Sequence, residues 1–183
     1  MPMRPGRCWV AIGVSPYYHS PLYATERRRL ETYYATGPDT SQNETDNWTE
    51  QINAAKKSDV VLYFGGIDVT TSSELNDRSS IAWLTSQLSL VKELCALGKP
   101  CVVVQLGEQL DDTALLNNPN VSAIIWAAYP GHDGGPAIFD VLDGTVSPAG
   151  RLPVTQYPAK YVDEIPMSDM ALHSQNGQPG RTY

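Results

Sequence analysis

Three short, continuous apolar runs, separated by segments with helical spacing, constrain the fold of this chain most strongly. The runs are DVVLYFGG (59–66), KPCVVVQLG (99–107) and NVSAIIWAAYPG (120–131). Apolar runs of this length without polar alternation are typical of parallel strands that are buried on both faces. The sequence therefore predicts a parallel-rich sheet that includes 59–65, 101–106 and 122–127.

Apolar residues recur every three or four positions between these runs, which is the spacing of one face of a helix. The pattern predicts helices over 85–97 and 135–143, a further helix within 47–58 and a short one at 111–118. Strands and helices that alternate with short connections predict an α/β fold, a mostly parallel sheet with helices on both faces. We expect a flavodoxin-like three-layer sandwich with a Pro/Gly-rich C-terminal tail.

The 183 residues suit one domain and are too few for a (β/α)8 barrel, which needs at least about 200. We assign the sandwich core to 47–157 and an irregular tail to 158–183. Residues 1–46 are harder to assign and are expected to belong to the same domain. Within them, PLYATERRRLETYYATG (21–37) could form an amphipathic helix, with its three arginines on a solvated face.

Composition and charge exclude several classes of protein. A net charge of −7 and a pI near 4.8 argue against nucleic-acid binding, which depends on a basic face. No apolar run approaches the roughly 20 residues that span a bilayer, and CWVAIGV (8–14) is a poor secretion signal because no small-residue cleavage site follows it. The sequons at Asn43, Asn47 and Asn120 nevertheless predict a secreted glycoprotein.

Neither the cysteines nor the histidines form a recognisable ligand set. Cys95 and Cys101 lie in apolar surroundings, where we expect buried free thiols, and Cys8 forms no CxxC pair with either. His132 and Asp133 could bind a metal only if partners came from elsewhere in the chain, so we expect no metal and no cofactor. The GHDGG segment around them is interpreted as a tight turn rather than a phosphate cradle.

The loop SSELNDRSS (72–80) is the strongest candidate for chemistry. Glu74, Asp77 and Arg78 lie just beyond the end of a predicted buried strand, and ligands of parallel sheets bind at that edge. A carboxyl group there could act as a general acid. The alternative is a surface ion pair or a cap at a helix start. Asp111 and Asp112 are already explained by the start of a short helix.

Several ordered motifs resemble the second domain of glycoside hydrolase family 3, and the fungal β-xylosidases of that family in particular. The resemblance covers about residues 15–183 and is strongest from 56 onward. The segments that carry it are KKSDVVLYFGGID, ELNDRSSIAW, LGKPCVVVQLG, NPNVSAIIWAAYPGHDGGPAIFDVLDGTVSPAGRLPVTQYP, PMSDMAL and PGRTY.

This resemblance implies specific roles. Family members are retaining enzymes whose nucleophilic aspartate belongs to a (β/α)8 barrel domain, while the acid/base glutamate comes from a loop of the second domain. That loop usually reads ExExxDR in xylosidase-like members, and the matching residues here are 72–78. The first glutamate is replaced by Ser72, so the resemblance implies Glu74 as the catalytic acid/base. It also implies substrate contacts at Asp77, Arg78 and His132.

The resemblance implies one domain of an extracellular glycosidase. Joined to its barrel domain, it would hydrolyse terminal β-xylosyl residues in xylan breakdown. The substrates would be β-xylosides or xylo-oligosaccharides, and arabinose or glucose specificity stays open. Without the barrel, we expect the chain to be inactive. Two alternatives remain: a truncated, non-catalytic sugar-binding or degenerate domain, and a free-standing binding protein with a small ligand at the YPGHDGG edge.

Overall fold

The computed structural model describes residues 18–38, 47–166, 168–175 and 180–181. The elements in chain order are α1 (Pro21–Arg27), α2 (Thr49–Lys57), β1 (Val61–Gly66), α3 (Thr85–Cys95), β2 (Cys101–Leu106), α4 (Thr113–Leu116), β3 (Ala123–Ala128), α5 (Gly134–Leu142) and α6 (Tyr161–Glu164). Among these residues, no helix is long and apolar enough to cross a membrane.

The strands form a parallel sheet in the order β1-β2-β3. Val61 pairs with Cys101 at one end of the first ladder, and Gly66 pairs with Leu106 at the other. The second ladder starts at Val102 and Ala123 and is interrupted by an irregularity after Gln105. All three carboxyl ends therefore lie at one edge of the sheet. The predicted strands and their parallel pairing are confirmed.

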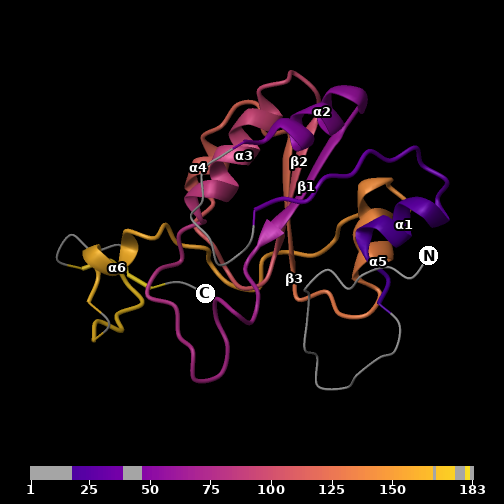
Figure 1. Cartoon of the computed structure of the whole chain (residues 1–183). Helices are drawn as coiled ribbons and strands as arrows, with labels where there is room; N and C mark the ends of the chain where they lie inside the picture. The colour runs from indigo at the N-terminus through magenta and orange to yellow at the C-terminus, as the bar shows by residue number, and fades with distance from the viewer. Residues whose placement is uncertain (1–17, 39–46, 167, 176–179, 182–183) are drawn as a thin grey trace.

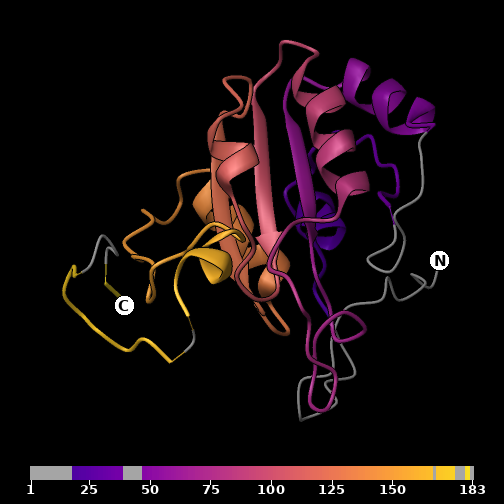
Figure 2. The same cartoon turned by 90° about the vertical axis from the view of Figure 1, so that its left-hand side faces the viewer.

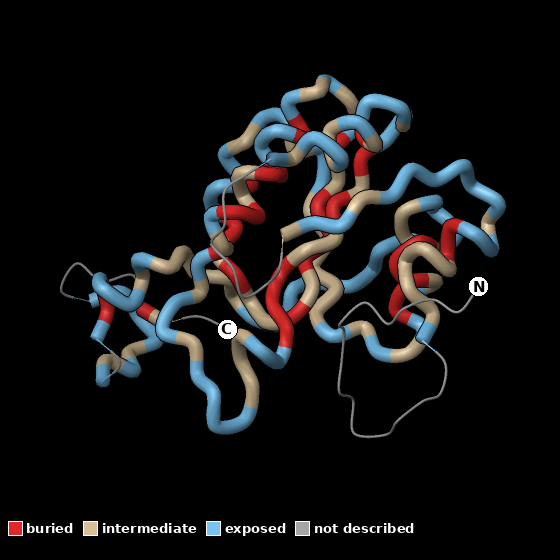
Figure 3. The backbone as a smooth tube through the Cα atoms, in the orientation of Figure 1, coloured by how far each residue is buried: buried red, intermediate tan, exposed pale blue. Residues whose placement is uncertain are grey.

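Helices cover both faces of the sheet, as predicted (Figure 1). Because side chains alternate along a strand, Val61 and Tyr63 join the core that contains Leu90 and Val91 of α3. Phe64 lies on the opposite face and stacks against Phe139 of α5, with ring centroids 6.4 Å apart. Figure 3 shows the buried residues concentrated along β1, β2 and α3. The three-layer α/β sandwich expected from the sequence is the observed architecture.

The predicted helix within 47–58 is also confirmed, and its end has a clear physical cause. The ammonium group of Lys99 donates to the carbonyl oxygens of Ala55 at 2.9 Å and Lys56 at 2.7 Å, and to that of Ser58. These carbonyls lie at the C-terminal end of α2, where a cation is favoured, and the Ala55 carbonyl also accepts from the Ser58 N–H at 3.2 Å. Lys99 therefore ties the end of α2 to the start of β2.

Cys95 and Cys101 form a disulfide, so the prediction of free thiols is wrong. Cys95 ends α3 and Cys101 begins β2, and both are buried. The tight turn between the two elements places their Cα atoms 5.3 Å apart, within the range that a disulfide bridges. Sequence spacing alone could not reveal this proximity, because it depends on how the turn folds back.

The arginine run is not simply a solvated face. α1 ends at Arg27, and Arg28 forms ion pairs with Asp140 and, at 2.8 Å, with Asp143. The Arg28 guanidinium also lies 5.4 Å from the ring centroid of Phe139. Arg28 is thus a clamp between α1 and α5, which pack side by side (Figure 1), whereas Arg27 and Arg29 are exposed as expected.

The described residues of the C-terminal tail are mostly irregular, and α6 is a helical turn among them. Asp111 joins the tail to the sandwich because its carboxylate accepts hydrogen bonds from the backbone N–H of Thr113 at 2.9 Å and of Ala159 at 2.8 Å. Burial opposes ionisation of Asp111, but these hydrogen bonds prevail and hold its pKa below the ordinary value.

Among the described residues, β1 pairs with another strand on one side only, and on its other side a side chain binds the last backbone groups. Gln87 of α3 is 1% exposed, and its amide oxygen accepts from the Gly66 N–H at 2.9 Å while its amide nitrogen donates to the Gly66 carbonyl at 2.8 Å. Tyr63 donates to the same amide oxygen at 3.2 Å. Gln87 therefore satisfies, in a buried position, the backbone groups that an adjacent strand would otherwise pair.

Replacing Gln87 by Leu should lower the free energy of unfolding by about 2–4 kcal/mol. The leucine fills similar space but leaves the Gly66 N–H and carbonyl buried without partners, at about 1–3 kcal/mol each. Urea denaturation would measure the loss. Gln109→Leu is the matched control: Gln109 makes one long, partly buried contact to the Tyr157 carbonyl at 3.4 Å, and its loss should cost less than about 1 kcal/mol. Equal losses in the two variants would contradict this account.

The Arg28 clamp should make the stability of the fold depend on pH in the acid range. The hydrogen bond from Arg28, followed by those from Thr145, lowers the pKa of Asp143 to about 2. A depressed carboxyl pKa contributes stability above the unfolded value near 4, and this contribution is lost as the pH falls through about 2. Asp143→Asn should therefore melt at a lower temperature than the parent at pH 5, and the difference should close between about pH 4 and 2. Asp163→Asn, on α6, should follow the parent throughout; a constant Asp143→Asn deficit would argue against the clamp.

Candidate functional site

The three loops that leave the carboxyl ends of the strands form the candidate site. They are 67–84 after β1, 107–112 after β2 and 129–133 after β3. Figures 1 and 2 show the first loop extending beyond the end of the sheet. Because β1 and β2 are neighbours in a parallel sheet, residues far apart in sequence can meet here.

The loop after β1 is organised by two successive turns. Asp68 is 8% exposed, and its carboxylate accepts from the backbone N–H of Thr70 at 2.9 Å and from its hydroxyl at 2.5 Å. Beyond it, Ser73 and Asn76 exchange two backbone hydrogen bonds of 3.0 and 2.9 Å. The two turns give a polar loop a defined shape without a hydrophobic core of its own.

Glu74 is one of the two central residues of the Ser73–Asn76 turn and is exposed. The other is Leu75, which has a φ of 65° and is 98% exposed. A leucine in left-handed backbone geometry and fully in solvent is unfavourable on its own. Since both central residues of the turn are exposed, the turn presents Glu74 outward from the edge of the sheet.

Arg78 lies inside the loop, paired with a residue that sequence reasoning did not single out. Its guanidinium is 3.4 Å from the carboxylate of Glu108, and its side chain is 16% exposed. The Ser72 hydroxyl lies 3.1 Å from the same carboxylate. One Arg78 nitrogen, Nη1, is buried and has no hydrogen-bond partner among the described residues. The sequence did contain a signal for Glu108, since this residue directly follows the apolar run 99–107.

Tyr129, at the end of β3, completes this group. Burial raises the pKa of its phenol, as do the charges of Glu108 and Asp68, whereas Arg78 lowers it. The phenol therefore stays protonated at neutral pH and can donate a hydrogen bond. Asp77 is different: it is exposed, and no ion pair joins it to Arg78 in the described part of the chain.

His132 and Asp133 lie in the turn after β3 with a partner from the far end of the chain. His19 and His132 each direct a ring nitrogen at Asp133, the latter at 3.1 Å. The hydrogen bond from His19, followed by that from His132, holds the pKa of Asp133 below its usual value. Gly131 has a φ of 69°, so the interpretation of this segment as a tight turn is consistent with its backbone.

Asp112 is the N-cap residue of α4, as its place at a helix start predicted. Its carboxylate accepts from the Trp83 indole N–H at 3.0 Å. Burial raises the pKa of Asp112, which the Trp83 hydrogen bond partly offsets. Asp112 is therefore a structural residue that fixes the end of the loop after β1.

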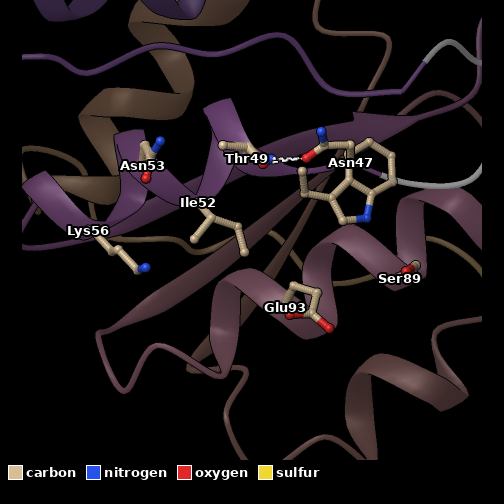
Figure 4. A pocket seen from close by; sticks show the side chains of 8 residues that line it. Asn47, Thr49, Ile52, Asn53, Lys56, Ser89 and Glu93 are labelled. Carbon is tan, nitrogen blue, oxygen red and sulfur yellow. Dashed lines mark hydrogen bonds between the residues drawn. The ribbon is translucent and has the colours of Figure 1, made fainter.

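A groove of about 470 Å³ lies between α2 and α3 (Figure 4). These two helices lie away from the loop that carries Glu74 (Figure 1). The lining of the groove includes Trp48, Ile52, Lys56 and Glu93. Asn47 lies at its rim, where its side-chain oxygen accepts from the Thr49 N–H at 3.2 Å and from the Thr49 hydroxyl. These contacts form a turn immediately before α2, whose N-cap residue is Trp48.

The other two sequons are those at Asn43 and Asn120. Asn120 is exposed in the turn before β3. Asn43 lies outside the described residues. Exposure is what a modified asparagine requires, and Asn47 and Asn120 both meet it.

Comparison with known proteins identifies what this chain is similar to. The model of the glycosyl hydrolase family 3 C-terminal domain matches residues 6–183. A probable exo-1,4-beta-xylosidase bxlB from Aspergillus fumigatus is 49% identical over 172 residues, which are 93% of this chain and 22% of that protein. A probable exo-1,4-beta-xylosidase xlnD from Neosartorya fischeri is 47% identical over the same shares. The chain thus spans about a fifth of the length of these relatives.

Solved structures agree. A GH3 exo-beta-xylosidase (XlnD), in complex with a xylobiose aziridine activity-based probe, superposes with a TM-score of 0.85 at 43% identity, covering 93% of this chain and 23% of that one. A GH3 beta-glucosidase from Bifidobacterium adolescentis superposes with a TM-score of 0.73 at 27% identity, covering 91% of this chain and 24% of that one.

Proposed function

Since the chain belongs to glycosyl hydrolase family 3 and matches the C-terminal domain of that family, we propose that it supplies the acid/base residue of a retaining β-xylosidase. The residue is Glu74. The observation that carries the proposal is the position of Glu74 at the outward turn of the loop after β1, on the edge where parallel sheets bind ligands. The identity with exo-1,4-beta-xylosidases over 93% of the chain supports the choice of sugar.

Glu74 has two successive tasks in this reaction. First, a carboxylate of a separate barrel domain attacks the anomeric carbon, the bond to the leaving oxygen breaks, and Glu74 gives its proton to that oxygen. Then Glu74, now a carboxylate, removes a proton from water as the water attacks the same carbon and releases the nucleophile. An exposed side chain at the tip of a defined turn suits this role, because it can approach a sugar held by another domain.

Arg78 and its neighbours are proposed to hold the sugar. The buried, unpartnered Nη1 of Arg78 can donate to a hydroxyl, while Glu108 fixes the other side of the guanidinium. Asp77 can accept from a hydroxyl because it is exposed on the same loop. His132 would contact the substrate through the ring nitrogen that does not face Asp133.

The remaining context follows from the same proposal. The substrates are β-xylosides and xylo-oligosaccharides from xylan, the protein is extracellular, and Asn43, Asn47 and Asn120 carry glycans. The Cys95–Cys101 disulfide supports an oxidising compartment. Since the proposed nucleophile belongs to the barrel domain, the 183 residues alone should not turn over xylosides.

The test is a chimera in which this chain replaces the matching domain of the XlnD exo-β-xylosidase. We expect the chimera to hydrolyse xylobiose and Glu74→Gln to lower its kcat by about 10²–10⁴-fold, the usual size of general acid/base catalysis. With a 2,4-dinitrophenyl xyloside, Glu74→Gln should slow the cleavage of the glycosidic bond much less, because that leaving group departs without a proton. Azide should then accelerate turnover of the variant and yield β-xylosyl azide.

Glu50→Gln is the matched control, since Glu50 is an exposed glutamate in the first turn of α2. It should leave kcat within about twofold of the parent chimera, because a surface substitution far from the site removes no catalytic group. Full xylobiose turnover by the Glu74→Gln chimera would exclude Glu74 as the acid/base. A folded but inactive parent chimera would favour a non-catalytic, degenerate domain.

A further inference from the structure

We propose that His19, His132 and Asp133 form a binding site for a divalent transition-metal ion of the zinc class. One ligand atom from each residue lies within 4.8 Å of the other two. This site goes beyond the proposed hydrolase function. It shares His132 with the proposed sugar contacts, and it is tested by zinc binding rather than by turnover.

The cluster joins two segments that are 114 positions apart in sequence. His19 precedes α1, while His132 and Asp133 lie between β3 and α5. They meet because α1 packs along α5, a contact that the Arg28 clamp reinforces. The sequence contains no HxxxH or HExxH spacing, so a pattern search cannot find this set.

Backbone contacts hold the two segments in register at the cluster. The His19 N–H donates to the His132 carbonyl at 3.0 Å, and the Gly135 N–H donates to the His19 carbonyl at 3.0 Å. Gly135 allows this approach because a Cβ there would overlap the carbonyl oxygen of Ser20. Ligands that are fixed by main-chain hydrogen bonds lose little freedom when they bind an ion, which favours affinity.

The orientation of the first histidine is also fixed. The His19 ring stacks on Tyr23, with centroids 4.1 Å apart and planes 12° from parallel. The His132 ring meets the His19 ring edge-on at 4.8 Å. Both rings direct a nitrogen at the carboxylate between them, and the His132 nitrogen lies 3.1 Å from it. Tetrahedral zinc with bonds near 2.0–2.1 Å separates its ligand atoms by roughly 3.3 Å, and the His132–Asp133 pair already has about this spacing.

The donor set indicates the class of ion. Two imidazoles and one carboxylate suit zinc, cobalt, nickel or copper, whereas calcium and magnesium prefer oxygen ligands alone. The side chains are 29%, 36% and 67% exposed in the order His19, His132 and Asp133, so an ion could enter and keep water in its remaining position. The alternative is a carboxylate shared by two histidines with no ion, and the test separates the two.

Zinc alone is the probe, added to the 183-residue chain after EDTA treatment and followed by calorimetry. We expect one zinc at this site, with Co²⁺ giving the visible absorption of a low-coordinate nitrogen and oxygen site. His19→Gln and Asp133→Asn should each weaken zinc binding by at least about 10–100-fold, the range seen when a supporting residue of a metal site is lost. His173→Gln is the matched control, since His173 is the third histidine and is exposed in the tail; it should leave affinity unchanged.

Histidine-ring NMR of the unmodified chain gives a second reading that needs no variant. Zinc should shift the ring signals of His19 and His132 and leave that of His173 in place. The proposal is overturned if zinc does not bind up to about 1 mM, where the binding free energy is only about 4 kcal/mol. Unchanged affinity in both ligand variants, or a shift confined to His173, overturns it as well.

Discussion

The paired hydrogen bonds between the Gln87 side chain and the Gly66 backbone satisfy the last polar groups of β1, where the chain leaves the sheet for the loop that carries Glu74. Within the described residues, β1 lies at one side of the sheet, and its last polar groups are buried. Gln87 supplies both a donor and an acceptor to them from α3. The chain can then leave the sheet immediately, and the Asp68 and Ser73–Asn76 turns carry Glu74 outward.

Two independent anchors shape the rest of that edge. Glu108, at the end of β2, holds Arg78 of the preceding loop, and this contact follows from the neighbouring positions of β1 and β2. On the other face of the sheet, α1 packs on α5 and brings His19 to Asp133. The first anchor supports the proposed sugar contacts. The second supports the proposed metal site, which includes His132, a residue also proposed to contact the sugar.

The disulfide and Lys99 act at the opposite end of the strands. The Cys95–Cys101 bridge ties the end of α3 to the start of β2, and the Lys99 ammonium ties the same turn to the end of α2. Because both act at the amino ends of the strands, the carboxyl edge is left to polar loops. In open parallel sheets, ligands bind at that carboxyl edge.

The sequence by itself determined the order of the elements from α2 to α5, because apolar spacing reports on local geometry over a few residues. That spacing predicted β1, β2, β3, α3 and α5 within two residues of their observed ends. The tertiary structure alone decided that Cys95 bonds Cys101, that Glu108 holds Arg78, and that His19 reaches Asp133. The physical reason is that such pairs depend on chain reversal, strand order and helix packing, and a local period contains none of these.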